Sequence, residues 1–216
     1  MNALRGILFD YGGTMTNPVS ESITVWMNED GIVPGSFTRT LRAWLGADAP
    51  PGSPIHLLEL GRLDVNEFNA LLAAQLQTHD GEPAASKGIL RRMFAGMRPD
   101  PAMFQLVADL RAAGVRVGLL SNSWGSSYPR DQIDAAFDAV VISGEVGMRK
   151  PESEIYLHAL ERLGLPADVV AFVDDAEANL RGARAVGLRT HLHTDAATTR
   201  RALAAWLPAL THAEES

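Results

Sequence analysis

An apolar run near the amino terminus predicts the first buried strand. Residues 4–9 are largely apolar, which favours a strand covered on both faces, and the run ends abruptly in Asp10. Gly12 and Gly13 come next, and glycine lets the backbone turn closely around a ligand. Because open parallel sheets bind ligands at the carboxyl ends of their strands, we interpret Asp10 as a candidate nucleophile.

The apolar positions then change to a helical period, and no strand pattern returns before residue 98. A helix is expected from Pro18, and Asp64 with Glu67 has the spacing of a capping box at the start of another. Residues 46–54 are rich in proline and glycine and predict a loop. Residues 17–97 therefore predict an all-helical cap inserted after the first strand.

From residue 98 the pattern alternates between helix and strand, which is typical of parallel βαβ units. We expect strands over 115–120, 139–142, 169–173 and 188–192, and helices over 101–113, 133–137, 152–163, 180–187 and 199–210. The predicted fold class is α/β. Residues 1–16 and 98–216 form a Rossmann-like, doubly wound parallel sheet core, and residues 17–97 form the inserted cap.

Composition narrows the classes of function. The chain has 216 residues, a formal net charge of -7 and no long run of lysine or arginine. Binding to nucleic acid or to an anionic membrane depends on positive charge, so both partners are disfavoured. A small-molecule partner is therefore expected. The absence of cysteine excludes thiolate catalysis and cysteine-bound metals. No apolar stretch could span a bilayer and no secretory signal pattern is present, so we expect a cytoplasmic protein, as a monomer or homodimer.

Polar side chains of complementary type follow the predicted strands. Asp10 ends the first strand, Ser121 follows the second, and Asp174 and Asp175 follow the fourth. Lys150 lies in the loop after the third strand. In a parallel sheet these strand ends share one edge, so we expect the five side chains to converge there.

Carboxylates gathered at that edge require a compensating cation. Like charges close together are costly, and oxygen-only donors without histidine or cysteine favour Mg²⁺. Together with the positive charge of Lys150 they describe a phosphate site, whose expected phosphate contacts are Gly12, Gly13, Ser121, Asn122 and Lys150. Attack by Asp10 on phosphorus would give an aspartyl-phosphate, which water then hydrolyses.

Four segments resemble, in order and spacing, the haloacid dehalogenase (HAD) superfamily of hydrolases: ILFDYGGTM, GLLSNSW, GMRKPESEIY and VAFVDDAEANLRGARAVGL. The resemblance implies that Asp10 is the nucleophile and that Ser121 and Lys150 bind phosphate. It implies a Mg²⁺ site made by Asp10, the carbonyl of Gly12, Asp174 and Asp175. The helical insert is similar to the cap of the first subclass, and DYGGT is most similar to the branch of the soluble epoxide hydrolase amino-terminal phosphatase domain.

Gly12 departs from the pattern of most phosphatases in that family, which carry a second Asp two residues after the nucleophile. That Asp acts as general acid and base, a contribution on the order of a hundred- to ten-thousand-fold, and glycine cannot transfer a proton. The polar candidates of the cap are His56, Glu59, Arg62 and Asp64. Of these, His56 is our hypothetical replacement for the missing acid.

Two other functions stay open at this point. The metal-free dehalogenases of the family also lack the second Asp and use the same carboxylate on carbon, but they have a serine-rich fourth motif where this chain has Asp174 and Asp175. Alternatively, the chain is a phosphate-ligand binding or interaction module that kept the fold and lost turnover. The two adjacent carboxylates favour a Mg²⁺-dependent phosphatase of a small phosphomonoester.

Overall fold

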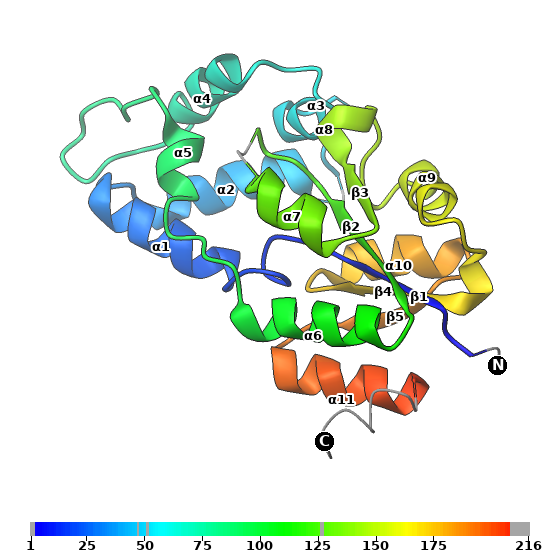
Figure 1. The fold of residues 1–216 in the computed structure, drawn as a ribbon. Helices are drawn as coiled ribbons and strands as arrows, with labels where there is room; N and C mark the ends of the chain where they lie inside the picture. The colour runs from blue at the N-terminus through cyan, green and yellow to red at the C-terminus, as the bar shows by residue number, and fades with distance from the viewer. Residues whose placement is uncertain (1–2, 47, 51, 126–127, 208–216) are drawn as a thin grey trace.

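Five parallel strands form one sheet in the order β3-β2-β1-β4-β5 (Figure 1). They are β1 (Gly6–Phe9), β2 (Arg116–Ser121), β3 (Ala139–Ile142), β4 (Val170–Asp174) and β5 (Arg189–Leu192). This computed structural model describes residues 3–46, 48–50, 52–125 and 128–207. The pairing confirms the predicted α/β class and places β1 in the middle of the sheet.

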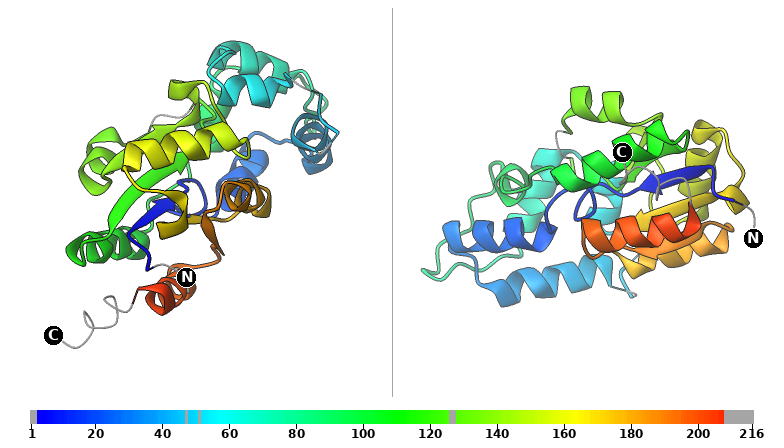
Figure 2. Two further views of the ribbon diagram at one scale, coloured as in Figure 1. Left: turned by 90° about the vertical axis from the view of Figure 1, so that its right-hand side faces the viewer. Right: turned by 60° about the horizontal axis from the view of Figure 1, so that its bottom comes forward.

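Helices cover both faces of this sheet, as a doubly wound fold requires (Figure 2). One face packs against α6 (Pro101–Ala112), α7 (Arg130–Ala136) and α11 (Ala196–Trp206), and the other against α9 (Ser153–Leu163) and α10 (Glu177–Ala185). Neighbouring residues of β1 serve opposite faces, since Phe9 lies in the first apolar core and Leu8 in the second. Both faces are buried, which is why the strand sequences are nearly continuous apolar runs.

The segment predicted to be the cap contains helices and no named strand among its described residues. The helices are α1 (Val19–Glu29), α2 (Pro34–Leu45), α3 (Pro54–Glu59), α4 (Val65–Ala73) and α5 (Ile89–Met93). They enclose an apolar cluster of their own, which includes the fully buried Trp26 and Phe68. The two connections to the sheet pair at Thr16 and Pro99 in an antiparallel bridge. The bridge lies at the predicted boundary, and the division into domains stays a prediction.

Two aspartates begin helices where the sequence predicts them. Asp64 accepts hydrogen bonds from the first free N–H groups of α4, and Asp100 does the same at α6. Such caps satisfy donors that have no partner inside the helix. Among the described residues, none of the helices has the length and apolar character that crossing a bilayer requires.

The structure corrects several predicted bounds. α3 begins at Pro54, inside the residues expected to form a loop, and its 6 residues are too few to display a helical period. A short helix, α8 (Ser143–Val146), lies in the segment expected to be the loop after β3. A 3-10 turn over Ala167–Val169 precedes β4. α11 ends at Trp206, and residues 208–210 of the predicted last helix lie outside the described residues.

Candidate active site

Asp10 lies at the carboxyl edge of the sheet, one residue beyond β1. Its N–H donates to the carbonyl of Val173 at 2.9 Å, which extends the pairing of β1 with β4 past the end of the strand. Because Phe9 pairs with Val173, the strand register brings Asp10 level with Asp174. The side chain is buried, with 7% of the residue exposed. Regular sheet pairing therefore sets both carboxylates side by side.

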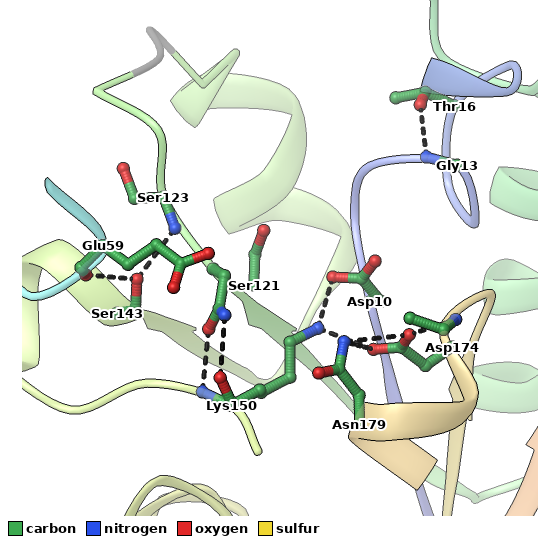
Figure 3. A network of polar contacts seen from close by, with 12 residues as sticks. Asp10, Gly13, Thr16, Glu59, Ser121, Ser123, Ser143, Lys150, Asp174 and Asn179 are labelled. Atoms are coloured by element: carbon green, nitrogen blue, oxygen red, sulfur yellow. Dashed lines mark hydrogen bonds and ion pairs between the residues drawn. The ribbon is translucent and has the colours of Figure 1, made fainter. Parts of the chain in front are cut away.

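Lys150 joins these two carboxylates (Figure 3). Its Nζ lies 2.6 Å from Asp10 Oδ1 and 2.7 Å from Asp174 Oδ2. The side chain is fully buried, and its ammonium group also lies 5.3 Å from the centre of the Phe172 ring. The predicted convergence of Asp10, Lys150 and Asp174 is thus present as direct contacts.

Asn122 positions the main chain of Lys150. Its side-chain amide donates to the Lys150 carbonyl at 3.1 Å and accepts from the Lys150 N–H at 2.9 Å. These two hydrogen bonds make Asn122 a positioning residue for Lys150. They use one of the two N–H groups of the amide, and the expected phosphate contact from the other stays a prediction.

Asp174 is held from the side of α10. Its carboxylate accepts hydrogen bonds from the N–H of Ala176 at 2.7 Å and from the Asn179 side chain at 3.0 and 3.1 Å. Tyr156 in turn donates to the carbonyl of Asn179 at 2.7 Å. Asn179 gave no sequence signal of its own, because it lies on a helix face five residues after Asp174 and belongs to no predicted strand end.

Asp175 is exposed, in contrast to Asp174, and its carboxylate comes close to the turn after β1. Gly13 has φ +78°, and a Cβ built there would lie 2.4 Å from Asp175 Oδ2. Glycine at this position therefore gives Asp175 access to the site. The N–H of Gly13 donates to Thr16 Oγ1 at 2.9 Å (Figure 3), so a contact from this N–H to phosphate would need that hydrogen bond to break.

The cluster carries more negative than positive charge. Asp10, Asp174 and Asp175 can place one oxygen each within 4.8 Å of one another, and the Lys150 ammonium group contacts Asp10 and Asp174. Burial raises the pKa of Asp10 to about 7; Lys150 opposes this rise and Asp174 adds to it. Burial alone would lower the pKa of Lys150, but Asp10 and Asp174 outweigh it and raise that pKa.

This donor set fits a divalent cation of the hard type. All three side chains offer carboxylate oxygens, which are the ligands that Mg²⁺ and Ca²⁺ prefer in proteins. A cation would lower the pKa of Asp10 and relieve the repulsion among three carboxylates. Gly12 lies in the same turn as Gly13, where its carbonyl is the predicted fourth ligand.

Ser121 is the last residue of β2 and is buried. Since Phe9 pairs with Leu119, Ser121 lies two residues past that pair, next to the turn that follows Asp10. Its hydroxyl is 2.9 Å from the hydroxyl of Tyr128. Sequence reasoning did not single out Tyr128, because its segment has neither a helical nor a strand pattern.

A second buried ion cluster joins the cap to the sheet; we call it the cap–core seam. Glu59, at the end of α3, pairs with Arg149 at 2.7 Å and accepts from the Trp124 indole at 3.0 Å. The main-chain carbonyl of Glu59 accepts from the buried Ser143 hydroxyl at 2.6 Å (Figure 3). Gly61 lets the backbones approach, since a Cβ there would lie 2.4 Å from the Gly144 carbonyl oxygen.

The contacts of the polar candidates of the cap lie away from Asp10. The charges acting on the His56 imidazole are those of the seam residues Arg149 and Glu59 and of Glu152, and burial together with Arg149 lowers its pKa. Asp64 caps α4, and Arg62 is exposed. Glu59, the remaining polar candidate of the cap, links the cap to the core through Arg149, Trp124 and Ser143.

A cavity of about 320 Å³ lies where the cap faces the carboxyl edge of the sheet. The cap contributes apolar side chains to its wall, and the sheet side contributes Tyr128 and Ile142; the cap residues are Leu58, Leu63 and Val65. Tyr128 thus lines this cavity, and its hydroxyl contacts that of Ser121. Asp10, Ser121 and Lys150 are not among the lining residues of the cavity, so the contact between Tyr128 and Ser121 is what links this cavity to the carboxylate cluster.

Comparison with known proteins gives one family and several relatives. The family model for haloacid dehalogenase-like hydrolases matches residues 4–187. Sesquiterpene phosphatase of Aspergillus oryzae is 31% identical over 191 residues, covering 85% of this chain and 87% of that protein. Bifunctional epoxide hydrolase 2 of Rattus norvegicus is 28% identical over 218 residues, covering 93% of this chain. The chain spans only 38% of the length of that rat protein.

Solved structures share the fold. A HAD family enzyme from Bacteroides thetaiotaomicron, crystallised with magnesium and inorganic phosphate, has a TM-score of 0.66 at 20% identity, covering 88% of this chain and 94% of that one. A dehalogenase has a TM-score of 0.62 at 19% identity, covering 88% and 84%. At these identities the likeness shows the fold and does not separate the two activities.

Proposed function

Since this chain belongs to the haloacid dehalogenase-like hydrolases, we propose that it is a Mg²⁺-dependent phosphatase that acts on a small phosphomonoester. The observation that carries the proposal is the cluster in which Lys150 contacts the buried Asp10 and Asp174, with the exposed Asp175 close by. Such a cluster is suited to a cation and an anionic substrate. The similarity to a sesquiterpene phosphatase supports the same chemistry.

In this mechanism Asp10 is the nucleophile. Its carboxylate forms a bond to phosphorus while the bond from phosphorus to the leaving oxygen breaks, which gives an aspartyl-phosphate. Water then attacks phosphorus, releases inorganic phosphate and restores the carboxylate. Lys150 reduces the repulsion between the carboxylate and the phosphoryl group, and the Ser121 hydroxyl donates to a phosphoryl oxygen.

The residues that would hold Mg²⁺ are Asp10, Asp174, Asp175 and the carbonyl of Gly12. When bound, the cation neutralises charge on the carboxylates and on the phosphoryl oxygens. Two asparagines position these groups: Asn122 holds the main chain of Lys150, and Asn179 holds the carboxylate of Asp174.

The second candidate function is that of a dehalogenase, with Asp10 attacking carbon. The glycine at position 12 favours it, because the metal-free dehalogenases also lack the second Asp. The charge of the site opposes it, because halide leaves without a metal and the acidic pair Asp174 and Asp175 would only repel the substrate carboxylate. A binding module without turnover is the third candidate, and the presence of a nucleophile in contact with Lys150 argues against it.

One panel of assays separates these functions. Purified protein is given 4-nitrophenyl phosphate, a set of phosphorylated metabolites and a 2-haloacid, each with Mg²⁺ and with chelator, while phosphate and halide are measured. We expect phosphate release that requires Mg²⁺. Halide release that persists in chelator would establish the dehalogenase, and ligand binding without turnover would establish the binding module.

A further inference from the structure

The proposed reaction needs a proton for the leaving oxygen, and position 12 does not provide one. An alkoxide is a poor leaving group, which is why phosphatases use a general acid. A Cβ built at Gly12 would lie 3.3 Å from Val19 Cγ2 and 3.7 Å from Met97 Cε, so apolar groups flank this position. The donor must therefore come from another element.

Tyr128 brings a phenol hydroxyl to the site from the segment between β2 and α7. Its oxygen is 2.9 Å from Ser121 Oγ, the hydroxyl assigned to the phosphoryl group. Its ring packs on the ring of Tyr11 with a centroid distance of 5.2 Å and a tilt of 53°. Tyr11 is the residue after Asp10, so the two contacts fix the phenol between the nucleophile's own turn and the end of β2.

The direction of the reaction places the leaving group on the same side as this phenol. In an in-line displacement the leaving oxygen lies opposite the nucleophile, and Asp10 attacks from the sheet. The leaving oxygen therefore faces the cap. Tyr128 lines the cavity between the cap and the sheet, where the organic part of the substrate would lie.

We propose that Tyr128 is the general acid and base of this site, in place of the side chain that Gly12 lacks; the inference rests on the proposed phosphatase function. In the first step the bond between phosphorus and the leaving oxygen breaks, and the Tyr128 proton moves to that oxygen. In the second step the phenolate takes a proton from the attacking water. The phenol is restored, and phosphate is released.

The contacts of three other candidate proton donors lie away from Ser121. The His56 imidazole is in the field of Arg149, Glu59 and Glu152 at the cap–core seam. Glu59 is buried in its ion pair with Arg149. Tyr156 donates its hydroxyl proton to the carbonyl of Asn179. Tyr128 is the hydroxyl that contacts both Ser121 and the cavity wall.

The test compares leaving groups in Tyr128→Phe, which keeps the ring and removes the hydroxyl. 4-Nitrophenolate leaves without protonation, whereas an alkoxide requires it. We expect kcat/KM of the variant to fall about 100-fold on an alkyl phosphate and less than about 3-fold on 4-nitrophenyl phosphate, within the range of general acid catalysis. Tyr11→Phe is the matched control, since it removes a neighbouring hydroxyl and retains the ring contact.

The outcomes distinguish the inference from the function on which it rests. A selective loss on the alkyl phosphate, in a variant whose far-ultraviolet circular dichroism matches the wild type, supports Tyr128 as the acid. An equal loss on both substrates would make Tyr128 a positioning residue for Ser121 and would overturn the proposal. The absence of any loss would also overturn it. A wild-type protein inactive on every phosphate ester would overturn the phosphatase function and this inference together. A selective loss on the alkyl phosphate in Tyr11→Phe would assign the proton to Tyr11 and also overturn the proposal.

Discussion

Two ion clusters contain neighbouring basic residues, Arg149 and Lys150, and differ in their balance of positive and negative charge. Lys150 contacts Asp10 and Asp174 and has Asp175 close by, so three carboxylates share one ammonium group. Arg149 pairs with one buried carboxylate, that of Glu59, and with the exposed Glu152. The first cluster lies at the sheet edge, and the second lies at the cap–core seam.

The difference separates a site for chemistry from a structural joint. A buried pair with matched charges and good hydrogen bonds is satisfied by the protein alone. A buried group with excess negative charge is stabilised by binding a cation, and its pKa values are shifted until it does. The strand ends that form the first cluster are far apart in sequence, and together they create an excess of negative charge. Such an excess therefore indicates a functional site more strongly than the burial of charged side chains does.

Removal of the nucleophile should have the largest effect. Asp10→Asn keeps the shape of the side chain and abolishes its attack on phosphorus. Phosphate release should fall on the order of ten-thousand-fold or more, because no covalent intermediate can form. The measurement is initial rate on 4-nitrophenyl phosphate with Mg²⁺. A variant that retains a tenth of wild-type turnover would contradict the assignment of Asp10.

Removal of the Lys150 ammonium group should lower both the stability and the activity of the protein. Lys150→Met leaves the three carboxylates without their ammonium group, and an uncompensated buried charge typically costs about 3–5 kcal/mol. Mg²⁺ should restore part of the free energy of unfolding, because it supplies positive charge, while turnover stays low. Urea unfolding with Mg²⁺ and with chelator measures both effects. Unchanged stability in chelator would show that Lys150 does not balance the cluster.

The seam pair should behave differently, as a balanced unit. Glu59→Gln retains an acceptor for Trp124 but removes the charge, and Arg149→Met removes the guanidinium. Each single change should cost about 3 kcal/mol, at the lower end for a buried pair, whereas the double variant should recover most of that loss. Unfolding by urea of all four proteins gives the coupling energy, and the double variant should keep most of its turnover. Additive losses would contradict the pairing.

A smaller effect is expected in the dependence of stability on pH. Burial raises the folded-state pKa of Asp10 to about 7 from its ordinary 3.8, so the metal-free protein should lose stability as pH rises from about 4 to about 7. Burial lowers the pKa of His193, which should instead cause a loss as pH falls below about 6.5. Asp10→Asn should weaken the first trend and leave the second; what remains of the first trend in the variant comes from Asp175, whose pKa is also raised by burial and by Asp174. Saturating Mg²⁺ should remove the first trend. A first trend that persists undiminished in both would contradict the account of Asp10.

The sheet edge was predictable from the sequence because regular structure links position to geometry. An apolar run that ends in Asp10, and another that ends at Asp174, require only strand pairing to bring both carboxylates together. The caps at Asp64 and Asp100 were readable for a similar reason, since a short local pattern decides them.

The cap–core seam and the contacts of Asn122 and Tyr128 were not predictable, because no local sequence pattern encodes them. Glu59 and Arg149 are 90 positions apart, and their pairing depends on how the cap sits on the sheet. Asn122 acts through hydrogen bonds to the main chain of Lys150, which leave no spacing signal. Tyr128 lies in an irregular segment, so its contact with Ser121 emerges only in three dimensions.

The most direct test of the central claim is to trap the covalent intermediate. The protein is mixed with 4-nitrophenyl phosphate and Mg²⁺, quenched in acid within the first turnovers, digested and examined by mass spectrometry. We expect a phosphoryl group on the peptide that contains Asp10, with none in chelator and none in Asp10→Asn. Phosphate release without any phosphorylated peptide, or a phosphoryl group on another residue, would contradict the account.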